Sequence, residues 1–216
     1  MSQVFPRSAN VFAPLSLVGA GLLVVGVVVA LLVVNRSAYA TEINSPVPQP
    51  IDFSHRHHVG EEGFDCRYCH ATAETSAFAG MPASTTCMNC HSQVLAQSPK
   101  LAVLRQSVQQ NVPIICNRVY QLPDYVYFDH SAHVTHGIGC ETCHGEVNQM
   151  SGMWKATSLQ MSWCLDCHNH PEKYVRPLDA VYQMGYVPTI PQAILGPQLV
   201  AQYGIKRLTD CSTCHR

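Results

Sequence analysis

One five-residue pattern, C-x-x-C-H, occurs five times in this chain of 216 residues. Two cysteines separated by two residues and followed directly by a histidine are typical of covalent haem attachment, in which the thiols form thioethers and the imidazole binds the iron. The attachment cysteines are Cys66, Cys69, Cys87, Cys90, Cys140, Cys143, Cys164, Cys167, Cys211 and Cys214. The predicted proximal iron ligands are His70, His91, His144, His168 and His215. The sequence therefore predicts five c-type haems.

Zinc sites and disulfide bridges are the alternatives for so many cysteines. Paired C-x-x-C motifs bind zinc, and the cysteines of an extracytoplasmic chain can form disulfides. Neither alternative explains why a histidine follows every second cysteine, or why no C-x-x-C occurs without one. The eleventh cysteine, Cys116, lies outside the motifs, and we expect it to be a buried free thiol.

The number of residues per motif limits what the protein can bury around each haem. Only 176 residues follow position 40, or roughly 35 for each motif, too few for separate apolar cores. We therefore expect a multihaem cytochrome c fold, with short helices and irregular loops around a haem core. Charged residues make up 12% of the chain and the formal net charge is -1. This composition argues against nucleic-acid binding and indicates a surface largely covered by partner subunits.

The N-terminal region contains a long apolar run. The run from Leu15 to Val34 has twenty residues and no charge. Twenty apolar residues are enough for a helix that crosses a bilayer. We predict a transmembrane helix over 13–35, with residues 1–12 in the cytoplasm. A cleaved signal peptide is the alternative, since Ala38 to Ala40 resembles a cleavage site, but the run exceeds the usual signal-peptide core. Because c-type haems are attached outside the cytoplasmic membrane, the haem domain is expected on the periplasmic side.

A linker is predicted over 36–52, because the prolines Pro46, Pro48 and Pro50 favour a stiff, extended chain. The predicted extracytoplasmic domain covers 53–216. Two further segments outside the motifs have readable patterns. Ser98 and Pro99 form an N-cap and first-turn pair for a helix through about Gln110, and 113–128 is expected to be extended.

The domain contains an internal duplication. Phe53, His55 and His58 have the same F-x-H-x-x-H spacing as a second copy that begins at Phe128, and the first cysteine follows 13 and 12 residues after the phenylalanines. This similarity predicts two dihaem units, at about 53–91 and 128–168, with a fifth haem at 211–215. Residues three apart share a helix face, so each pair can serve neighbouring irons. The predicted distal ligands are His55, His58, His130 and His133.

The remaining histidines, His57, His136 and His170, have no matched positions and are expected to be surface or structural residues. The fifth motif, Cys211 to His215, is followed only by Arg216 in this sequence, so we expect its sixth ligand to come from upstream or to be water. Methionine is a frequent haem ligand, and Met150 and Met161 both lie shortly before the fourth motif. Both are candidates, although methionine also fills gaps in apolar cores.

Aromatic residues and prolines define the other connecting segments. Tyr120, Tyr125, Tyr127 and Phe128 are available to pack on haem faces. Prolines at 171, 177, 188, 191 and 197 predict that no long helix forms over that span. A loop that wraps the haems or a partner subunit is expected there.

The order of these motifs resembles the pentahaem cytochrome c subunit of alternative complex III, a bacterial quinol-oxidising complex. The resemblance rests on one N-terminal anchor and on the segments FSHRHH before CRYCH, MPASTTCMNCH, LPDYVYFDHSAH before CETCHG, and MSWCLDCH. It implies a membrane-anchored electron relay that is not an enzyme by itself. It further implies partner subunits, including an iron–sulfur subunit and a monohaem cytochrome c, in a respiratory or photosynthetic complex.

Three other functional classes are compatible with a multihaem cytochrome c. A multihaem reductase is often marked by an altered proximal ligand, and none of the five motifs is altered. A stand-alone shuttle would not need the anchor. A membrane-anchored quinol dehydrogenase, which oxidises quinol itself and feeds an extracytoplasmic reductase, stays open as the alternative, although no quinol pocket is obvious in the sequence.

Overall fold

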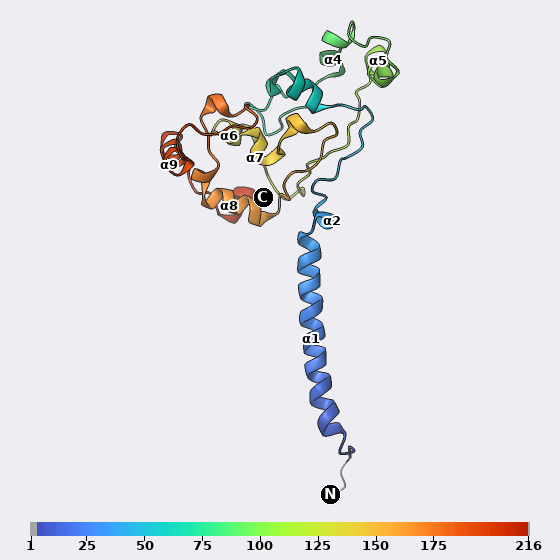
Figure 1. Cartoon of the computed structure of the whole chain (residues 1–216), viewed down its shortest axis with the longest axis vertical. Helices are drawn as coiled ribbons and strands as arrows, with labels where there is room; N and C mark the ends of the chain where they lie inside the picture. Colours follow the sequence, from blue (N-terminus) through green and yellow to red (C-terminus); the bar gives the residue numbers. More distant parts are fainter. Residues whose placement is uncertain (1–3, 216) are drawn as a thin grey trace. The chain divides into compact units, whose positions relative to one another are not determined.

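The computed structural model describes residues 4–215, and the chain divides into two compact units, 1–43 and 44–216. Residues 1–3 of the predicted cytoplasmic segment and residue 216 lie outside the described residues. The first unit consists of helix α1, Ala9–Arg36, and the short helix α2, Ala38–Thr41 (Figure 1). Between them Ser37 is extended, which interrupts the helix.

Helix α1 is long and apolar enough to cross a membrane, with a mean hydropathy of 3.1 over an 18-residue window. A signal sequence near an N-terminus meets the same criteria, so length and composition leave both readings open. The helix begins at Ala9, earlier than the predicted boundary at residue 13, and includes Pro14. Pro14 is the sixth residue of the helix, beyond the first turn, so its missing N–H removes one hydrogen bond inside the helix.

The second unit is helical, and residues 4–215 contain no β-strand, only three isolated bridges. Its α-helices are α3 Cys66–Cys69, α4 Ser84–His91, α5 Ala102–Gln110, α6 His130–Val134, α7 Cys140–His144, α8 Met161–Asn169, α9 Gln192–Gln202 and α10 Cys211–Cys214. Shorter turns are the π-helix η1 Arg56–Glu61 and the 3-10 turns η2 Pro99–Leu101, η3 Val147–Gln149, η4 Pro171–Lys173 and η5 Leu178–Ala180. Irregular loops join them, and the predicted fold class is confirmed.

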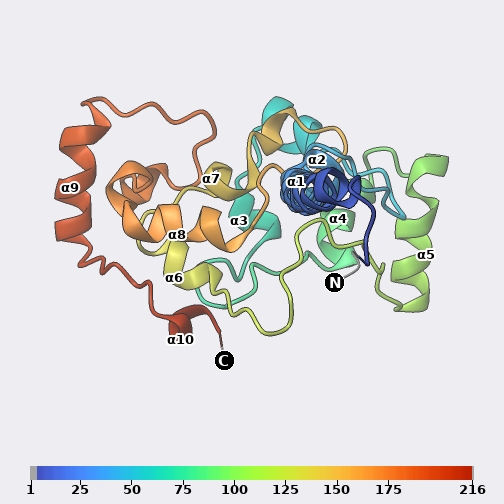
Figure 2. The same ribbon diagram turned by 90° about the horizontal axis from the view of Figure 1, so that it is seen from below.

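Within this unit, α5 and α9 lie at opposite ends, with α6, α7 and α8 between them (Figures 1 and 2). Few apolar side chains are buried by protein alone. The buried apolar residues of the described chain are Ala73, Leu104, Val134, Val147, Met150, Val175, Ala180, Val181 and Leu199. This apolar core is small for a unit of this length. A group bound by the C-x-x-C-H motifs would therefore supply much of the buried apolar surface.

The helix predicted to follow Ser98 and Pro99 is confirmed. The Ser98 side chain accepts a hydrogen bond from the N–H of Lys100, and η2 leads directly into α5. The helix ends at Asn111, which adopts the left-handed conformation that terminates many helices. Leu104, on the apolar face of α5, is 1% exposed.

The prediction of no long helix in the proline-rich span was wrong. Helix α9 runs for 11 residues with Pro191 as its N-cap and Pro197 inside it. An internal proline removes one helix hydrogen bond and costs about 3 kcal/mol or more. Tertiary packing offsets this cost, because α9 packs on η4: the Gln192 side chain donates to two carbonyls there, those of Glu172 and Val175, at 2.8 Å each.

Candidate haem-binding site

Every C-x-x-C-H motif begins a short helix or lies within one. Helices α3, α7 and α10 start at the first cysteine of their motifs, whereas α4 and α8 start three residues earlier. Asp65 caps α3 by accepting a hydrogen bond from the N–H of Arg67 at 2.8 Å. A single helical turn places both thiols and the following imidazole close together, which is the arrangement that covalent haem attachment requires. None of the eleven cysteines, all of which lie within residues 4–215, forms a disulfide.

The two F-x-H-x-x-H segments have nearly the same local geometry. Phe53 stacks on His58 at 4.5 Å and meets His55 edge-on at 4.9 Å, measured between ring centroids. In the second copy the equivalent distances from Phe128 are 4.5 Å to His133 and 4.8 Å to His130. The phenylalanine therefore fixes the orientation of both imidazoles in each copy, one by stacking and one by an edge contact.

Three histidine pairs face each other at a common distance. The ring centroids of His58 and His91 are 6.2 Å apart. Those of His130 and His144 are 6.4 Å apart, and those of His133 and His168 are 6.0 Å apart. Two imidazoles bound to opposite sides of one metal ion, with metal–nitrogen bonds of about 2 Å, have centroids about 6 Å apart. The three pairs therefore fit one haem iron each.

A fourth pair, His55 and His70, also joins an F-x-H-x-x-H histidine to a motif histidine, but its proximity is known from an effect on a pKa. His55 and His70 are close enough that His70 contributes to the lowered pKa of His55, after burial, which is the main cause and brings that pKa to about 4. The Nδ1 atom of His55 is buried without a hydrogen-bond partner. Burial likewise lowers the pKa of His144 to about 4 and lowers the pKa of His133. These rings are neutral at pH 7, as metal ligands must be.

Backbone carbonyls orient most of the candidate ligands. The Nδ1 atoms of His70, His130 and His133 are each within 2.8 Å of a carbonyl oxygen, and those of His58 and His91 are within 3.0 Å of one. A hydrogen bond at one ring nitrogen fixes the tautomer and leaves the other nitrogen free to bind metal.

Thiols of different motifs are also neighbours. The side chain of Cys66 lies close to that of Cys140, and this interaction, together with burial, raises the pKa of Cys140. Burial, with a contribution from Cys167, raises the pKa of Cys143 to about 12. The first motif therefore lies against the third, and the third against the fourth.

The fifth motif is held by the segment that precedes Phe128. The N–H of Tyr127 donates to the carbonyl of Cys214 at 2.8 Å. The Nδ1 atom of His215 lies 3.2 Å from the carbonyl oxygen of Tyr125, and the two rings stack with centroids 5.8 Å apart. Cys214 also contributes, after burial, to the raised pKa of Cys164. The fifth motif therefore lies beside the fourth.

The two methionine candidates for the fifth iron differ in exposure. Met150 is 2% exposed and packs near Gly145, directly after the third motif. Met161 is 66% exposed and is the first residue of α8, three residues before Cys164. Residues three apart share a helix face, so Met161 lies on the same face as the thiol that neighbours Cys214.

The histidines left unassigned from the sequence have other surroundings. His57 forms an exposed pair with Glu61 at 2.9 Å. His170 pairs with Asp166 at 3.3 Å, also exposed. The exposed ring of His136 lies 2.6 Å from the carbonyl oxygen of Ala132. Cys116, expected to be buried, is partly exposed and lies near Cys87.

A buried ion pair behind the third motif was not predicted from the sequence. Arg176 lies 2.8 Å from Glu141, which stands between the two cysteines of that motif, and their side chains are only 9% and 16% exposed. The other carboxylate oxygen of Glu141 accepts the N–H of Gly185 at 2.6 Å. The Arg176 guanidinium also lies over the ring of Tyr186, 5.0 Å from its centroid. An acidic residue inside a haem motif is the one sequence feature that could have drawn attention to this site.

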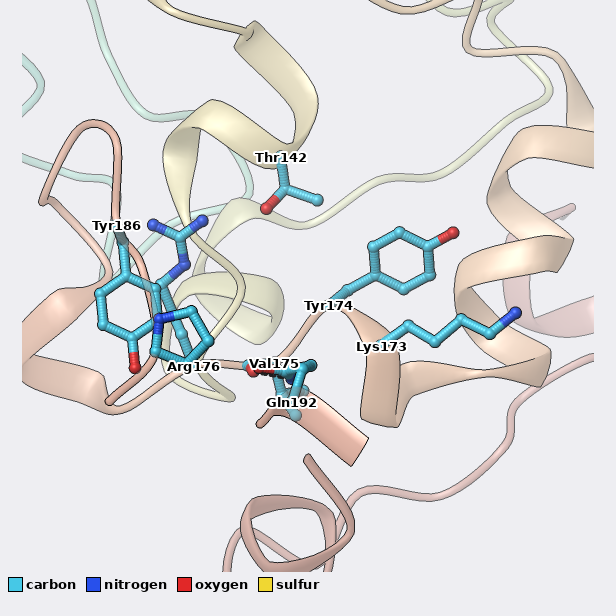
Figure 3. A pocket seen from close by; sticks show the side chains of 8 residues that line it. Thr142, Lys173, Tyr174, Val175, Arg176, Tyr186 and Gln192 are labelled. Atoms are coloured by element: carbon cyan, nitrogen blue, oxygen red, sulfur yellow. Dashed lines mark hydrogen bonds between the residues drawn. The ribbon is translucent and has the colours of Figure 1, made fainter. Parts of the chain in front are cut away.

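A cavity of about 240 Å³ opens beside this ion pair (Figure 3). Thr142 lies above it, Arg176 and Tyr186 form one side, and Lys173 and Tyr174 form the other. Tyr120 also contacts this motif: its hydroxyl donates to the carbonyl of Cys143 at 3.1 Å and accepts the N–H of Ala156 at 2.7 Å. The third motif is thus held by protein on several sides.

Comparison with known proteins agrees with this geometry. Residues 51–113 and 126–216 match the family of cytochrome c7 and related cytochromes c. The chain therefore belongs to this family of multihaem cytochromes c, whose haems are bound covalently. It is also 34% identical over 172 residues to the multihaem cytochrome c subunit of menaquinone reductase from Nitratidesulfovibrio vulgaris (strain Hildenborough), a match that covers 69% of this chain and 81% of that subunit. The prediction of haem over zinc or disulfides is confirmed.

Proposed function

We propose that this chain is a membrane-anchored pentahaem cytochrome that relays electrons in a quinone-linked complex similar to alternative complex III. The observation that carries the proposal is the set of histidine pairs at 6.0–6.4 Å, each joining a motif histidine to an F-x-H-x-x-H histidine. The name of the relative, a menaquinone reductase subunit, supports the link to quinone.

The proposed ligand pairs follow from these contacts. They are His70 with His55, His91 with His58, His144 with His130, and His168 with His133. For the fifth iron, opposite His215, we favour Met161 over Met150, because Met150 is packed inside the protein whereas Met161 is exposed near the fifth motif. Bound haems supply one-electron transfer. The protein holds the imidazoles neutral and fixes their orientation through Phe53, Phe128 and the carbonyl contacts.

The proposed placement in the membrane follows from α1. Residues 13–35 span the bilayer, 36–52 form the linker, and 53–216 carry the haems on the periplasmic side. The partners are the other subunits of the complex, among them an iron–sulfur subunit and a monohaem cytochrome c. This assignment keeps the chain as a relay, with quinol chemistry in a neighbouring subunit.

The test is whether quinol reduces the haems, and the absorbance of the haems measures the reduction. The complex that copurifies with a tagged chain from native membranes is compared with the chain isolated in detergent. We expect added quinol to reduce the haems of the complex but not those of the isolated chain. Reduction of the isolated chain would instead support the alternative, a quinol dehydrogenase. No reduction in either sample would contradict the proposal.

The opposite direction of flow is the second candidate, because the relative is named as a menaquinone reductase. In that case chemically reduced haems of the complex should be reoxidised by added quinone, and quinol should not reduce them. Measuring both reactions on the same preparation decides the direction.

A further inference from the structure

The two dihaem units contact each other through equivalent residues. The residue after the first distal histidine donates its N–H to the carbonyl of the residue six positions after the proximal histidine of the other unit. In one direction this is Arg56 to Met150 at 2.9 Å, and in the other it is Ser131 to Ser76 at 3.1 Å. Reciprocal contacts of this kind define a two-fold relation between like units.

Equivalent cysteines lie close together beside these two backbone bonds. Cys66 and Cys140 are the first cysteines of the first motif in each unit, and the side chain of each affects the pKa of the other. Close by, η1 packs on η3, and a Cβ atom at Gly60 would overlap the carbonyl oxygen of Asn148. We call this region the junction. At the junction the first motifs of the two units lie next to each other. The second motif of each unit lies farther from the junction.

Within each unit the two motifs are neighbours because their distal ligands share one turn. His55 and His58 stand three residues apart beside the same phenylalanine, and so do their equivalents in the second copy. A side-chain bond from Asn89 to Tyr68 at 3.1 Å also joins the first two motifs. In Figure 2, α3, α7 and α8 lie together on the side of α4 that faces α9.

The fifth motif extends one end of this arrangement. It is bonded to the segment 125–127, which leads into the second F-x-H-x-x-H, and Cys214 neighbours Cys164 of the fourth motif. The second motif, on α4, packs against α5 at the other end.

We infer that the haems form one unbranched row in the order second, first, third, fourth and fifth motif, with the two dihaem units joined head to head at the junction. This inference rests on the proposed function, in which each motif holds one haem. Electrons then enter and leave through the second and fifth motifs, and every electron crosses between the haems of Cys66 and Cys140. The order differs from the order of the motifs in the chain, since the first unit is reversed.

The test is electron cryo-microscopy of the haem-loaded, detergent-solubilised protein in its complex, with the five irons located from their density. We expect the iron bound by His70 to lie nearer to the iron bound by His144 than does the iron bound by His91. The iron bound by His215 should be nearest to that of His168. A structure with five haems in which the haem of the second motif, not that of the first, is next to the haem of the third motif would overturn the proposed order but not the pentahaem relay. A missing haem would overturn the order and the pentahaem relay together.

Discussion

Replacing His130 with alanine is expected to leave all haems attached and to convert one low-spin iron to high-spin. Attachment needs only the two cysteines and the proximal histidine, whereas the ring of His130, 6.4 Å from that of His144, would be lost as the sixth ligand. Axial ligands set haem potentials over about 0.8 V, and about 59 mV is a tenfold change in a one-electron equilibrium. We therefore expect electron flow through the row to fall at least about tenfold.

The companion variants make the result specific. His133→Ala should convert a different iron, that of His168, because its ring lies 6.0 Å from that histidine. His136→Ala is the matched control on the same segment, since this exposed ring is hydrogen bonded to Ala132 and Thr135 of its own segment. Electron paramagnetic resonance of the three variants reports the spin states. A new high-spin signal from His136→Ala but not from His133→Ala would show that the ligand assignment is wrong.

Replacing Arg176 with methionine should destabilise the haem domain strongly. The change removes the guanidinium but leaves the Glu141 carboxylate, 16% exposed, without its charged partner. Removing one partner of a buried ion pair costs about 3–5 kcal/mol. Because Glu141 stands between Cys140 and Cys143, the local loss of order should centre on the third motif. Guanidinium denaturation of the haem-loaded protein, followed by absorbance, measures the change.

Arg207 provides the control for this experiment. It pairs with Glu172 at 3.7 Å, and its side chain is 65% exposed, so Arg207→Met should change stability by less than about 1 kcal/mol. The double variant Arg176→Met with Glu141→Gln should recover part of the loss, because it removes the unpaired charge. If Arg176→Met were no less stable than Arg207→Met, the ion pair would have no structural role.

The structural features that could be predicted from the sequence are those determined by residues close together in the chain. The F-x-H-x-x-H spacing is local, and both copies place their histidines beside the phenylalanine at almost equal distances. The cap at Ser98 is equally local, because its hydroxyl bonds the N–H of Lys100, two residues ahead. The same holds for the haem motifs, since one helical turn includes both cysteines.

The parts that could not be predicted depend on contacts between distant segments. Arg176 is 35 residues from Glu141 and has no spacing that links the two. Helix α9 forms despite Pro197 because the Gln192 side chain bonds the carbonyls of Glu172 and Val175 and Leu199 is buried, contributions that outweigh local propensity. The pairing of distal with proximal histidines is also tertiary: His58 faces His91, 33 residues later, rather than the nearer His70.

We propose that one chain carries five covalently bound haems and keeps its N-terminal membrane anchor. Intact-mass spectrometry of the isolated subunit, after removal of non-covalently bound molecules, tests it most directly. We predict a mass equal to a chain that retains residues 1–40 plus five haems. A homogeneous sample with four or fewer haems would contradict the five-motif assignment, and a chain that begins at Thr41 would show that α1 is a signal peptide.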